Sequence, residues 1–356
     1  MTILCDCLEP LLRKVAVVER KLEENYPKLF HYTGFSGLEG IIKEQTLWAT
    51  NALFTNDVSE LHEFKVKFNE YMMPSLNEFI DALSKKPEKQ LDIQNLGGIE
   101  KIREILVDFI EHIYDFTFAG NLDHQPFVEP FIVSFCTTEN EAIEKHGLLS
   151  QWRGYGQEGG YALEFDTARL IKLLEQEGKK WEGGYDLFGG KVVYSNEPAA
   201  LFFDELGSEI AVIEKSFDRF LKDGDTTIFE DIYHPLIRSA CRYKHWGFHE
   251  EKEIRIISIP PNGHTFQSLE KKRKSEGLLT ERVVRRHFVR AGTPVPYIPL
   301  FEGITKLPDL PLPITRIIVG PHRDKELRRR AVISMLSQFQ LDIPVSVSDI
   351  PYVRNY

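Results

Sequence analysis

The chain has 356 residues, of which 42% are hydrophobic and 28% charged, and this is the composition of an ordinary globular protein rather than a disordered or fibrous one. Its formal net charge of −10 disfavours a general nucleic-acid binder, because that affinity depends on clustered Lys and Arg that neutralise phosphates. Four cysteines are too few for a disulfide framework, no apolar run approaches the roughly 18 residues that cross a bilayer, and the opening residues lack a signal-peptide pattern, so we expect a cytoplasmic protein with no membrane partner.

Helical and strand-like patterns alternate in the first third of the chain. Helices are predicted over residues 8–25, after residue 36, over 58–84 and over 99–114, and strands over 28–32 and 46–50. Two capping boxes, Ser36 with Glu39 and Asp57 with Glu60, are expected to begin the second and third of these helices. The segment 85–98 holds Pro and Gly among polar residues and is expected to join two helices.

Apolar runs of strand length dominate the remainder of the chain. The predicted strands there cover residues 131–136, 160–165, 191–194, 253–257, 283–288 and 316–319. With helices between several of them, this order predicts an α+β fold with a mixed, mostly antiparallel central sheet and helical insertions. We expect one ligand-binding domain over 28–325 with a helical insertion at about 58–126, preceded by a helix in 1–27 and completed by a helix and strand in 326–356.

The first of three polar segments contains His31, Tyr32 and Thr33 on a predicted strand. Alternation along the strand places His31 and Thr33 on one face and Tyr32 on the other. A histidine and a hydroxyl that point together can bind sugar hydroxyls. The alternative is a histidine whose hydrogen bonds are satisfied within the core.

The second segment carries Trp152, Arg153, Tyr155 and Tyr161 around a glycine-rich turn. Aromatic rings offer stacking surfaces, an arginine offers a fixed cation, and glycines let a ligand approach the backbone, which together suit a nucleotide. The turn matches neither the dinucleotide fingerprint nor the phosphate loop. The alternative is a hairpin turn with Trp152 in the core.

The third segment presents charged residues from a predicted strand. If the strand begins near Glu251, then Glu251, Glu253 and Arg255 line one face. Ile254 and Ile256 then enter the core from the other face. A solvated strand face is the alternative, but three long charges on a central strand require partners or a cleft.

Two further interpretations of this region involve a metal. His245 and His249 stand four residues apart, as in helical zinc sites, but a glycine lies between them and the internal glutamate of the metalloprotease motif is absent. Glu250, Glu251 and Lys252 distantly resemble the acid-x-Lys element of metal-dependent nucleases, yet no upstream acidic ligand stands out. We therefore expect no bound metal.

The same segments carry a resemblance to a bacterial family known only as domain of unknown function 2971, over about residues 28–325. The matching elements are His31-Tyr32-Thr33, the helix ending in Ile41-Ile42, residues 47–51, Asn56-Asp57 through Glu60, Ser134-Phe135, Trp152 through Tyr155, Gly160 through Phe165, and Glu251-x-Glu253-x-Arg255. The order and spacing are specific, but the family label states no activity.

The His-Tyr-Thr start and its following helix also look like ADP-ribosyltransferases of the His-Tyr-Glu kind, which include DNA-modifying toxins. This resemblance implies an ADP-ribosyltransferase-like fold in which His31 binds the adenosine-side ribose. It also implies that Tyr155 or Tyr161 stacks on nicotinamide, and that Glu253 or Glu251 binds the nicotinamide ribose. The middle segment departs from those enzymes in having Trp152 where they have a plainer element.

The leading hypothesis is therefore an NAD-dependent enzyme that ADP-ribosylates a protein or nucleic acid or hydrolyses NAD, as a toxin or a phage-defence effector. Its catalytic residues would be Glu253, Glu251 and Tyr155, and NAD would be bound as substrate by His31, Tyr32, Thr33, Trp152, Arg153, Tyr161 and Arg255. A carboxylate suits this chemistry because cleavage of the nicotinamide–ribose bond builds positive charge on the ribose. The alternatives are a nucleotide-binding sensor without catalysis and, third, a metal-dependent nuclease.

Overall fold

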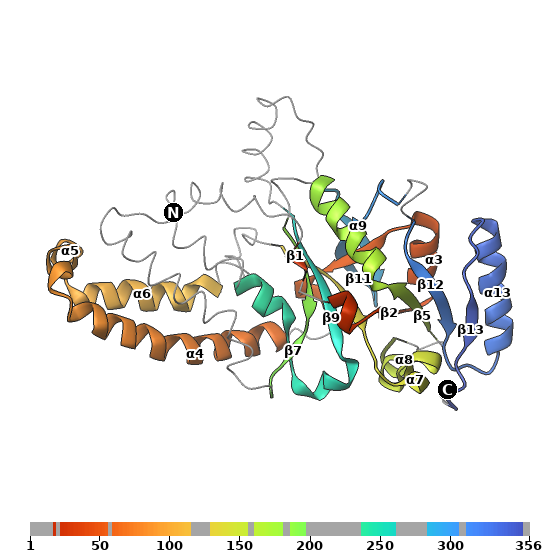
Figure 1. Ribbon diagram of the computed structural model, residues 1–356, viewed down its shortest axis with the longest axis horizontal. Helices are drawn as coiled ribbons and strands as arrows, with labels where there is room; N and C mark the ends of the chain where they lie inside the picture. Colours follow the sequence, from red (N-terminus) through yellow and green to blue (C-terminus); the bar gives the residue numbers. More distant parts are fainter. Residues whose placement is uncertain are drawn as a thin grey trace, which may run out of the picture.

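The protein is built on one large sheet, to which strands from almost the whole length of the chain contribute (Figure 1). The computed structural model describes residues 17–18, 22–55, 59–114, 129–155, 160–180, 186–196, 236–260, 283–305 and 311–351. Within these ranges the large sheet has 11 strands, and β7 and β8 form a separate pair. Most strand pairs are antiparallel, so the fold is the mixed, mostly antiparallel α+β class that the sequence predicts.

The strands are short, as in most globular proteins. They are β1 (Val17–Val18), β2 (Lys28–Thr33), β3 (Leu47–Asn51), β4 (Phe131–Cys136), β5 (Tyr161–Asp166), β6 (Asp186–Lys191), β7 (Val193–Tyr194), β8 (Tyr243–Lys244), β9 (Glu253–Ile259), β10 (Arg286–Arg290), β11 (Thr293–Leu300), β12 (Ile314–Val319) and β13 (Val345–Val347).

The helices differ widely in length. They are α2 (Leu22–Asn25), α3 (Phe35–Glu44), α4 (Ser59–Ser84), α5 (Gln90–Asn95), α6 (Ile99–Tyr114), α7 (Glu141–His146), α8 (Leu149–Tyr155), α9 (Thr167–Lys180) and α13 (Lys325–Gln338), with 3-10 turns η2 (Ala52–Phe54), η3 (Pro87–Lys89) and η5 (Trp246–Glu251). Among the described residues, no helix combines the length and the apolar composition that a membrane crossing needs.

The sheet divides into two branches at β4. One edge of β4 pairs along its whole length with β9, whereas the other edge is shared by two strands. Phe131 and Ile132 at its start pair with β3, and Cys136 at its end pairs with Phe30 of β2. The first branch continues from β2 through β5 and β12 to β13, and the second runs from β3 through β11 to β10.

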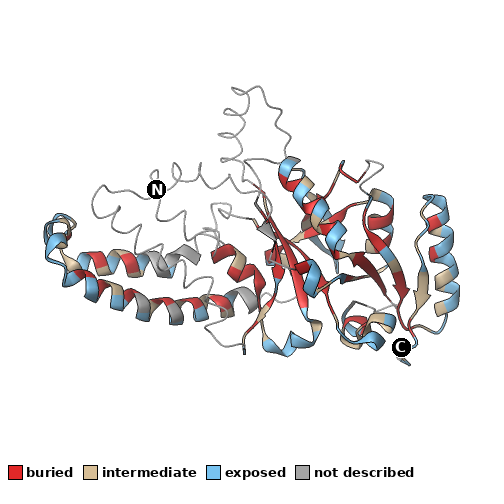
Figure 2. Ribbon diagram, viewed as in Figure 1, coloured by how far each residue is buried: buried red, intermediate tan, exposed pale blue. Residues whose placement is uncertain are grey.

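The two faces of the sheet bury separate cores. On one face, Ile132 and Ile257 pack with apolar side chains of α4 and α6, which form an arm that extends away from the sheet. On the other face, strand residues such as Val133 and Ile254 pack against α3, α9 and α13. Figure 2 shows this pattern as buried residues along the strands and on the facing sides of α4 and α6.

The predicted bounds of β4 and α6 are confirmed, and residues 85–98 do join two helices, α4 and α6, although this connection itself contains η3 and α5. The helix predicted over 8–25 is wrong at Val17–Val18, which form a strand parallel to β6, and is confirmed at Leu22–Asn25, which form α2. The remainder of that prediction, together with Asn56 and Asp57, lies outside the described residues.

The capping box predicted for α3 is also wrong. Ser36 lies inside this helix, whose N-cap is Gly34 and which has no side-chain cap. The adjacent aromatic residue, Phe35, is the first helical residue. A capping pattern in sequence does not fix the residue at which the chain turns into the helix.

Residues 293–300 form β11, where no strand is predicted. The strand contains Pro294, Pro296 and Pro299, and proline removes a backbone donor. The two-residue hairpin with β10 places the N of Thr293 toward β10, so that the nitrogens of Pro294 and Pro296 face the opposite side. β3 begins to pair only at Tyr297, and β10 does not reach Pro299. The backbone N–H groups that these prolines lack would therefore point to positions at which the described structure has no neighbouring strand.

Candidate functional site

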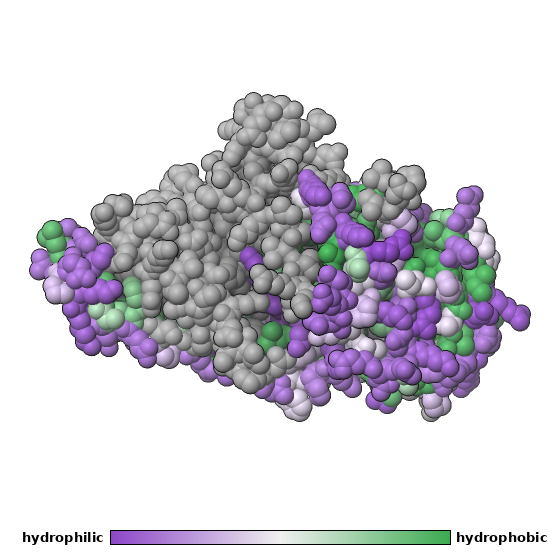
Figure 3. Space-filling view, in the orientation of Figure 1, coloured by the Kyte–Doolittle hydropathy of each residue, from purple (hydrophilic) through white to green (hydrophobic). Residues whose placement is uncertain are grey.

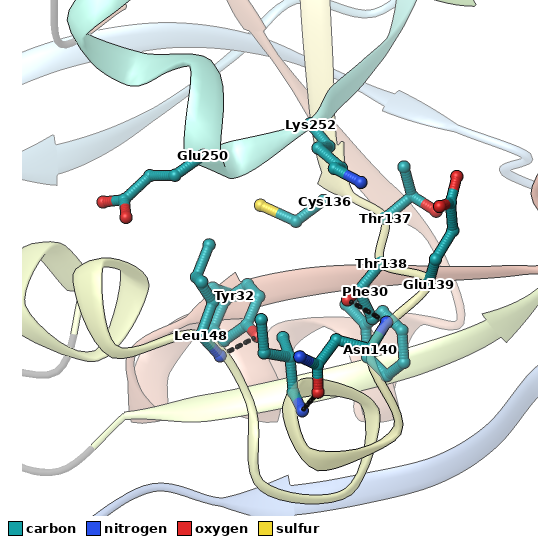
Figure 4. A pocket seen from close by; sticks show the side chains of 11 residues that line it. Phe30, Tyr32, Cys136, Thr137, Thr138, Glu139, Asn140, Leu148, Glu250 and Lys252 are labelled. Atoms are coloured by element: carbon teal, nitrogen blue, oxygen red, sulfur yellow. Dashed lines mark hydrogen bonds between the residues drawn. The ribbon is translucent and has the colours of Figure 1, made fainter.

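A pocket of about 420 Å³ lies on the face of the sheet that carries Phe30 and Tyr32 (Figure 4). Its lining residues come from β2, β4, the loop before α7, α7 itself, the residue before α8 and the end of η5: Phe30, Tyr32, Cys136, Thr137, Thr138, Glu139, Asn140, Ile143, Leu148, Glu250 and Lys252. Volumes of this order accommodate a small ligand or part of a larger one. On the face shown in Figure 3, the surface around α7 and α8 is mainly hydrophilic.

Strand register explains which side chains reach the pocket. Phe30 pairs with Cys136, and Cys136 pairs with Glu253, so these three residues form one row across β2, β4 and β9. Residues directly opposite one another in a sheet point to the same face. The floor of the pocket and the charged start of β9 are therefore neighbours on one side of the sheet.

Aromatic packing forms one wall of the pocket. Tyr32 meets Trp152 edge to face with ring centroids 4.9 Å apart, and its hydroxyl accepts a hydrogen bond of 2.8 Å from the backbone N–H of Leu148. Trp152 is 1% exposed and its indole N–H donates to the carbonyl of His146 at 3.0 Å. Trp152 thus holds α7, α8 and β2 together behind the pocket.

We expect Gly147→Ala to destabilise the protein by about 1–3 kcal/mol. Gly147 has a φ of +80°, and an added Cβ would lie 2.4 Å from Cζ2 of Trp152, which cannot move because it is buried. Gly154→Ala in α8 is the matched control, since its Cβ would meet nothing within 4 Å and alanine favours a helix. Urea denaturation of both variants measures the difference, and equal stabilities would contradict this account of the wall.

The opposite wall is a polar loop joining β4 to α7. The backbone N–H of Thr137 donates to the carbonyl of Lys252 at 3.2 Å, which ties this loop to the end of η5. Asn140 caps α7 through its side-chain oxygen, and its own N–H donates to the Thr138 hydroxyl at 3.0 Å. These contacts fix two hydroxyl-bearing residues at the pocket, where they can bind polar ligand atoms.

A buried charge network borders the pocket. Arg255 donates from Nε to a Glu253 carboxylate oxygen at 2.8 Å and from Nη1 to the Cys241 carbonyl at 2.7 Å. Lys244 Nζ bridges Glu251 and Glu253, with both N–O distances 2.7 Å. The Arg255 and Glu253 side chains are only 4% and 3% exposed, so water screens their charges little and each charge depends on its protein partners.

The two carboxylates of the network differ in their proton affinity. Burial alone would raise the pKa of Glu253, but the charges and hydrogen bonds of Arg255 and Lys244 outweigh it and hold the pKa at about 2. Burial raises the pKa of Glu251, and Lys244 offsets only part of that effect. Glu253 therefore stays ionised as a structural partner, whereas Glu251 forms a direct ion pair with Lys244, feels Arg255 only at a distance, and has a side chain 15% exposed.

Cys136 joins the network to the pocket. Burial raises the pKa of its thiol well above the ordinary value, and the negative charges of Glu251 and Glu253 raise it further. The thiol thus stays protonated and is a poor nucleophile at neutral pH. Glu251 itself is not among the residues that line the pocket, but its two chain neighbours, Glu250 and Lys252, are.

The prediction that His31 shares a cavity with Glu253 is wrong. His31 follows Phe30 and so points to the opposite face, where its ring lies 5.7 Å from that of Phe135. Its Nδ1–H donates to the carbonyl of Ser134 at 2.9 Å, within the fork of the sheet. Burial lowers the pKa of His31, and its hydrogen bond with the Ser134 carbonyl offsets this in part. His31 is therefore neutral, and its role is to satisfy a backbone carbonyl on the open edge of β4.

The remaining predicted residues of β2 and β5 divide between the faces in the same way. Thr33 pairs with Tyr161, and Tyr161 packs in the core of the His31 face, with its ring 6.3 Å from that of Phe35. Of the three residues His31, Tyr32 and Thr33, the described pocket is lined only by Tyr32.

The glycine-rich segment is helical where it is described, because Leu149–Tyr155 forms α8. Trp152 is buried, and the next residue, Arg153, is exposed because it lies about 100° further around the helix. The two side chains therefore do not act on one ligand. The side chain of Tyr155 and residues 156–159 lie outside the described part of the chain.

The third segment was predicted in part. Glu253 and Arg255 do share a face while Ile254 and Ile256 enter the core, but Glu251 belongs to η5 and not to β9. Lys244, the cation that joins both carboxylates, was missed, since it lies seven and nine residues away and no local pattern pairs it with them.

The pocket residues of the loop before α7 were also missed. Their one sequence signal is the run of hydroxyl and amide side chains at Thr137, Thr138 and Asn140 directly after a buried strand. Such runs are common at strand ends and helix caps, so the pattern alone does not indicate a ligand.

The paired histidines serve local roles. His245 caps η5 by accepting from the N–H of Gly247 at 3.1 Å, and His249 Nδ1 lies 2.9 Å from the carbonyl of Trp246. Among the residues that the structure describes, no group of three or more His, Cys, Asp or Glu side chains is arranged to hold a metal ion.

Comparison with known proteins gives one match. Residues 151–256 match a family described as "Protein of unknown function (DUF2971)", a stretch that includes Lys244, Glu251 and Glu253. The comparisons with curated proteins and with solved structures found no match. The resemblance to ADP-ribosyltransferases is not confirmed by these comparisons. From α8 to the middle of β9 the chain resembles the DUF2971 family, as its sequence motifs indicate.

Proposed function

We propose that the protein binds NAD or a related nucleotide in the pocket beside Tyr32 and cleaves its nicotinamide–ribose bond. The observation that carries the proposal is that Glu251 lies between Glu250 and Lys252, which both line a pocket with an aromatic wall and a hydroxyl-bearing wall, and that its charge raises the pKa of the lining residue Cys136. Aromatic surfaces suit a base, and hydroxyls suit a ribose. ADP-ribosyl transfer and NAD hydrolysis share this bond cleavage and differ only in the acceptor.

The reaction divides into departure of nicotinamide and capture of the ribosyl group. Nicotinamide leaves with both electrons of the C–N bond, which leaves positive charge on the ribose. The ionised Glu251 carboxylate stabilises that charge electrostatically. Water then adds to the ribose carbon and loses its proton to solvent, which gives ADP-ribose, or an acceptor hydroxyl, amine or amide adds and loses its proton in the same way.

The proposal revises the roles taken from sequence. Glu251 replaces Glu253 as the catalytic carboxylate, since Glu253 is neutralised by two cations. Ribose binding passes from His31 to Thr137 and Thr138. An ADP-ribosyltransferase-like fold remains part of the proposal, supported by the order of the three segments along the chain and by the adjacency of β2, β4 and β9.

The test is to incubate the purified full chain with NAD, with and without cell lysate, and to follow nicotinamide and labelled ADP-ribose. Nicotinamide release that depends on the protein is expected. Label transferred to protein or nucleic acid would identify a transferase, and free ADP-ribose a hydrolase. Loss of cellular NAD on expression would extend the proposal to a toxin or phage-defence role, whereas no release under any of these conditions would refute cleavage.

A second candidate is a nucleotide-binding sensor that does not cleave its ligand. The observation favouring it is the pairing of both carboxylates with Lys244, which neutralises charge that a catalyst would use. Saturable binding of NAD without nicotinamide release would establish the sensor and exclude the enzyme.

A further inference from the structure

The turn that ends η5 places one lysine at the pocket in an unusual backbone conformation. Lys252 has φ 42° and ψ 56°, the left-handed region that glycine adopts without strain and lysine rarely adopts. Its N–H donates to the His249 carbonyl at 3.3 Å, and its own carbonyl accepts from Thr137 at 3.2 Å. The backbone of Lys252 is thus held from both sides.

The side chain of Lys252 differs from the other cations near the pocket. Lys244 forms an ion pair with Glu251, and Arg255 forms one with Glu253. Lys252 is exposed and lines the pocket, and within the described ranges its ammonium has no hydrogen-bond or ion-pair partner. An ammonium at a pocket wall is a binding group for phosphate oxygens.

The two ends of the pocket differ in chemistry. Figure 4 shows Lys252 on the side of Thr137, Thr138 and Glu139, and Glu250 on the side of Leu148. Hydroxyls and an ammonium together suit a phosphate, and the side chains of Tyr32 and Leu148 at the other end, beside the Glu250 carboxylate, suit a ring. The carboxylate of Glu139 lies at the phosphate end and would oppose an anion there.

We propose that Lys252 binds the phosphate next to the ribose of the nucleotide, and so orients the ligand with its ring toward Tyr32 and Leu148. This inference rests on the proposed function for the ligand class. It adds that the pocket binds the phosphorylated nucleotide more tightly than the nucleoside. Lys252 attracts the phosphate, and the negative charge of Glu139 weakens that attraction.

The test compares binding of nicotinamide mononucleotide and nicotinamide riboside, which differ only in the phosphate. Binding to the full chain is measured by calorimetry in the Glu251→Gln background, so that neither ligand is consumed. Lys252→Gln is expected to weaken binding of the mononucleotide about tenfold, because a charge-assisted hydrogen bond is lost, and to change riboside binding less than about twofold. Glu139→Gln is expected to strengthen binding of the mononucleotide only.

Lys252→Gly separates the side chain from the backbone. It should weaken mononucleotide binding as Lys252→Gln does, while its midpoint of thermal unfolding stays equal or rises, because glycine accepts the left-handed conformation. Equal effects of Lys252→Gln on both ligands, or none on either, would overturn the inference alone. Binding of NAD but of neither smaller ligand would also overturn the inference alone, whereas failure to bind NAD as well would overturn the proposed function with it.

Discussion

Replacement of Glu251 with glutamine is expected to lower the rate of nicotinamide release about 10²- to 10³-fold and to change NAD affinity only a few fold. Glutamine keeps the shape of the side chain but removes the negative charge that the ribosyl cation requires. The charge acts in a site where burial already raises the pKa of Glu251, so little water screens it. Single-turnover measurements at saturating NAD separate the rate from binding.

Glu141→Gln is the matched control for this experiment. Glu141 is an exposed carboxylate on α7 that neither lines the pocket nor adds to the raised pKa of Cys136, so its replacement should leave release unchanged. Full activity of Glu251→Gln combined with loss of activity in Glu253→Gln would show that the wrong carboxylate has been assigned. A sensor would give no release for the parent protein either.

The pH dependence of turnover gives an independent check on Glu251. The carboxyl group must be ionised to stabilise positive charge, and its pKa lies above the ordinary value of 4.5 because burial outweighs its attraction to Lys244. Turnover should therefore fall on acidification at a higher pH than for an ordinary glutamate. A profile flat down to pH 4.5 would exclude Glu251 as the required anion.

The second large effect concerns stability. Glu253→Gln is expected to lower the free energy of unfolding by about 3–5 kcal/mol at neutral pH, because it leaves the buried Arg255 without its anion. Urea denaturation measures the loss. Glu144→Gln is the control, since the Glu144–Lys28 pair is partly exposed, with side chains 36% and 46% accessible, and is expected to contribute less than about 1 kcal/mol.

The effect of Glu253 should depend on pH in a defined direction. Its pKa is about 2 in the folded protein against an ordinary value of 4.5, so the folded state holds fewer protons than the unfolded state between these values. The stabilisation is complete above pH 4.5 and is lost as pH falls through about 2. The stability difference between the parent protein and Glu253→Gln should shrink over that window, and a difference that grew on acidification would contradict the assignment.

Local pattern determined much of the secondary structure and part of the network. Strict alternation along β9 put Glu253 and Arg255 on one face and Ile254 in the core, because successive side chains of a strand point to opposite faces. The helix predicted over residues 99–114 is observed as α6 with the same bounds. These features depend on residues a few positions apart, which sequence shows directly.

Tertiary structure alone decided which faces meet. The pairing of Phe30 with Cys136 and of Cys136 with Glu253 puts His31 on the far side of the sheet from Glu253, and a register shifted by one residue would have reversed this. Register between distant strands is set by the packing of the whole core and by no short motif. For the same reason Lys244 could not be assigned to its two carboxylates, and the pocket between β4 and η5 could not be seen, until the chain was folded.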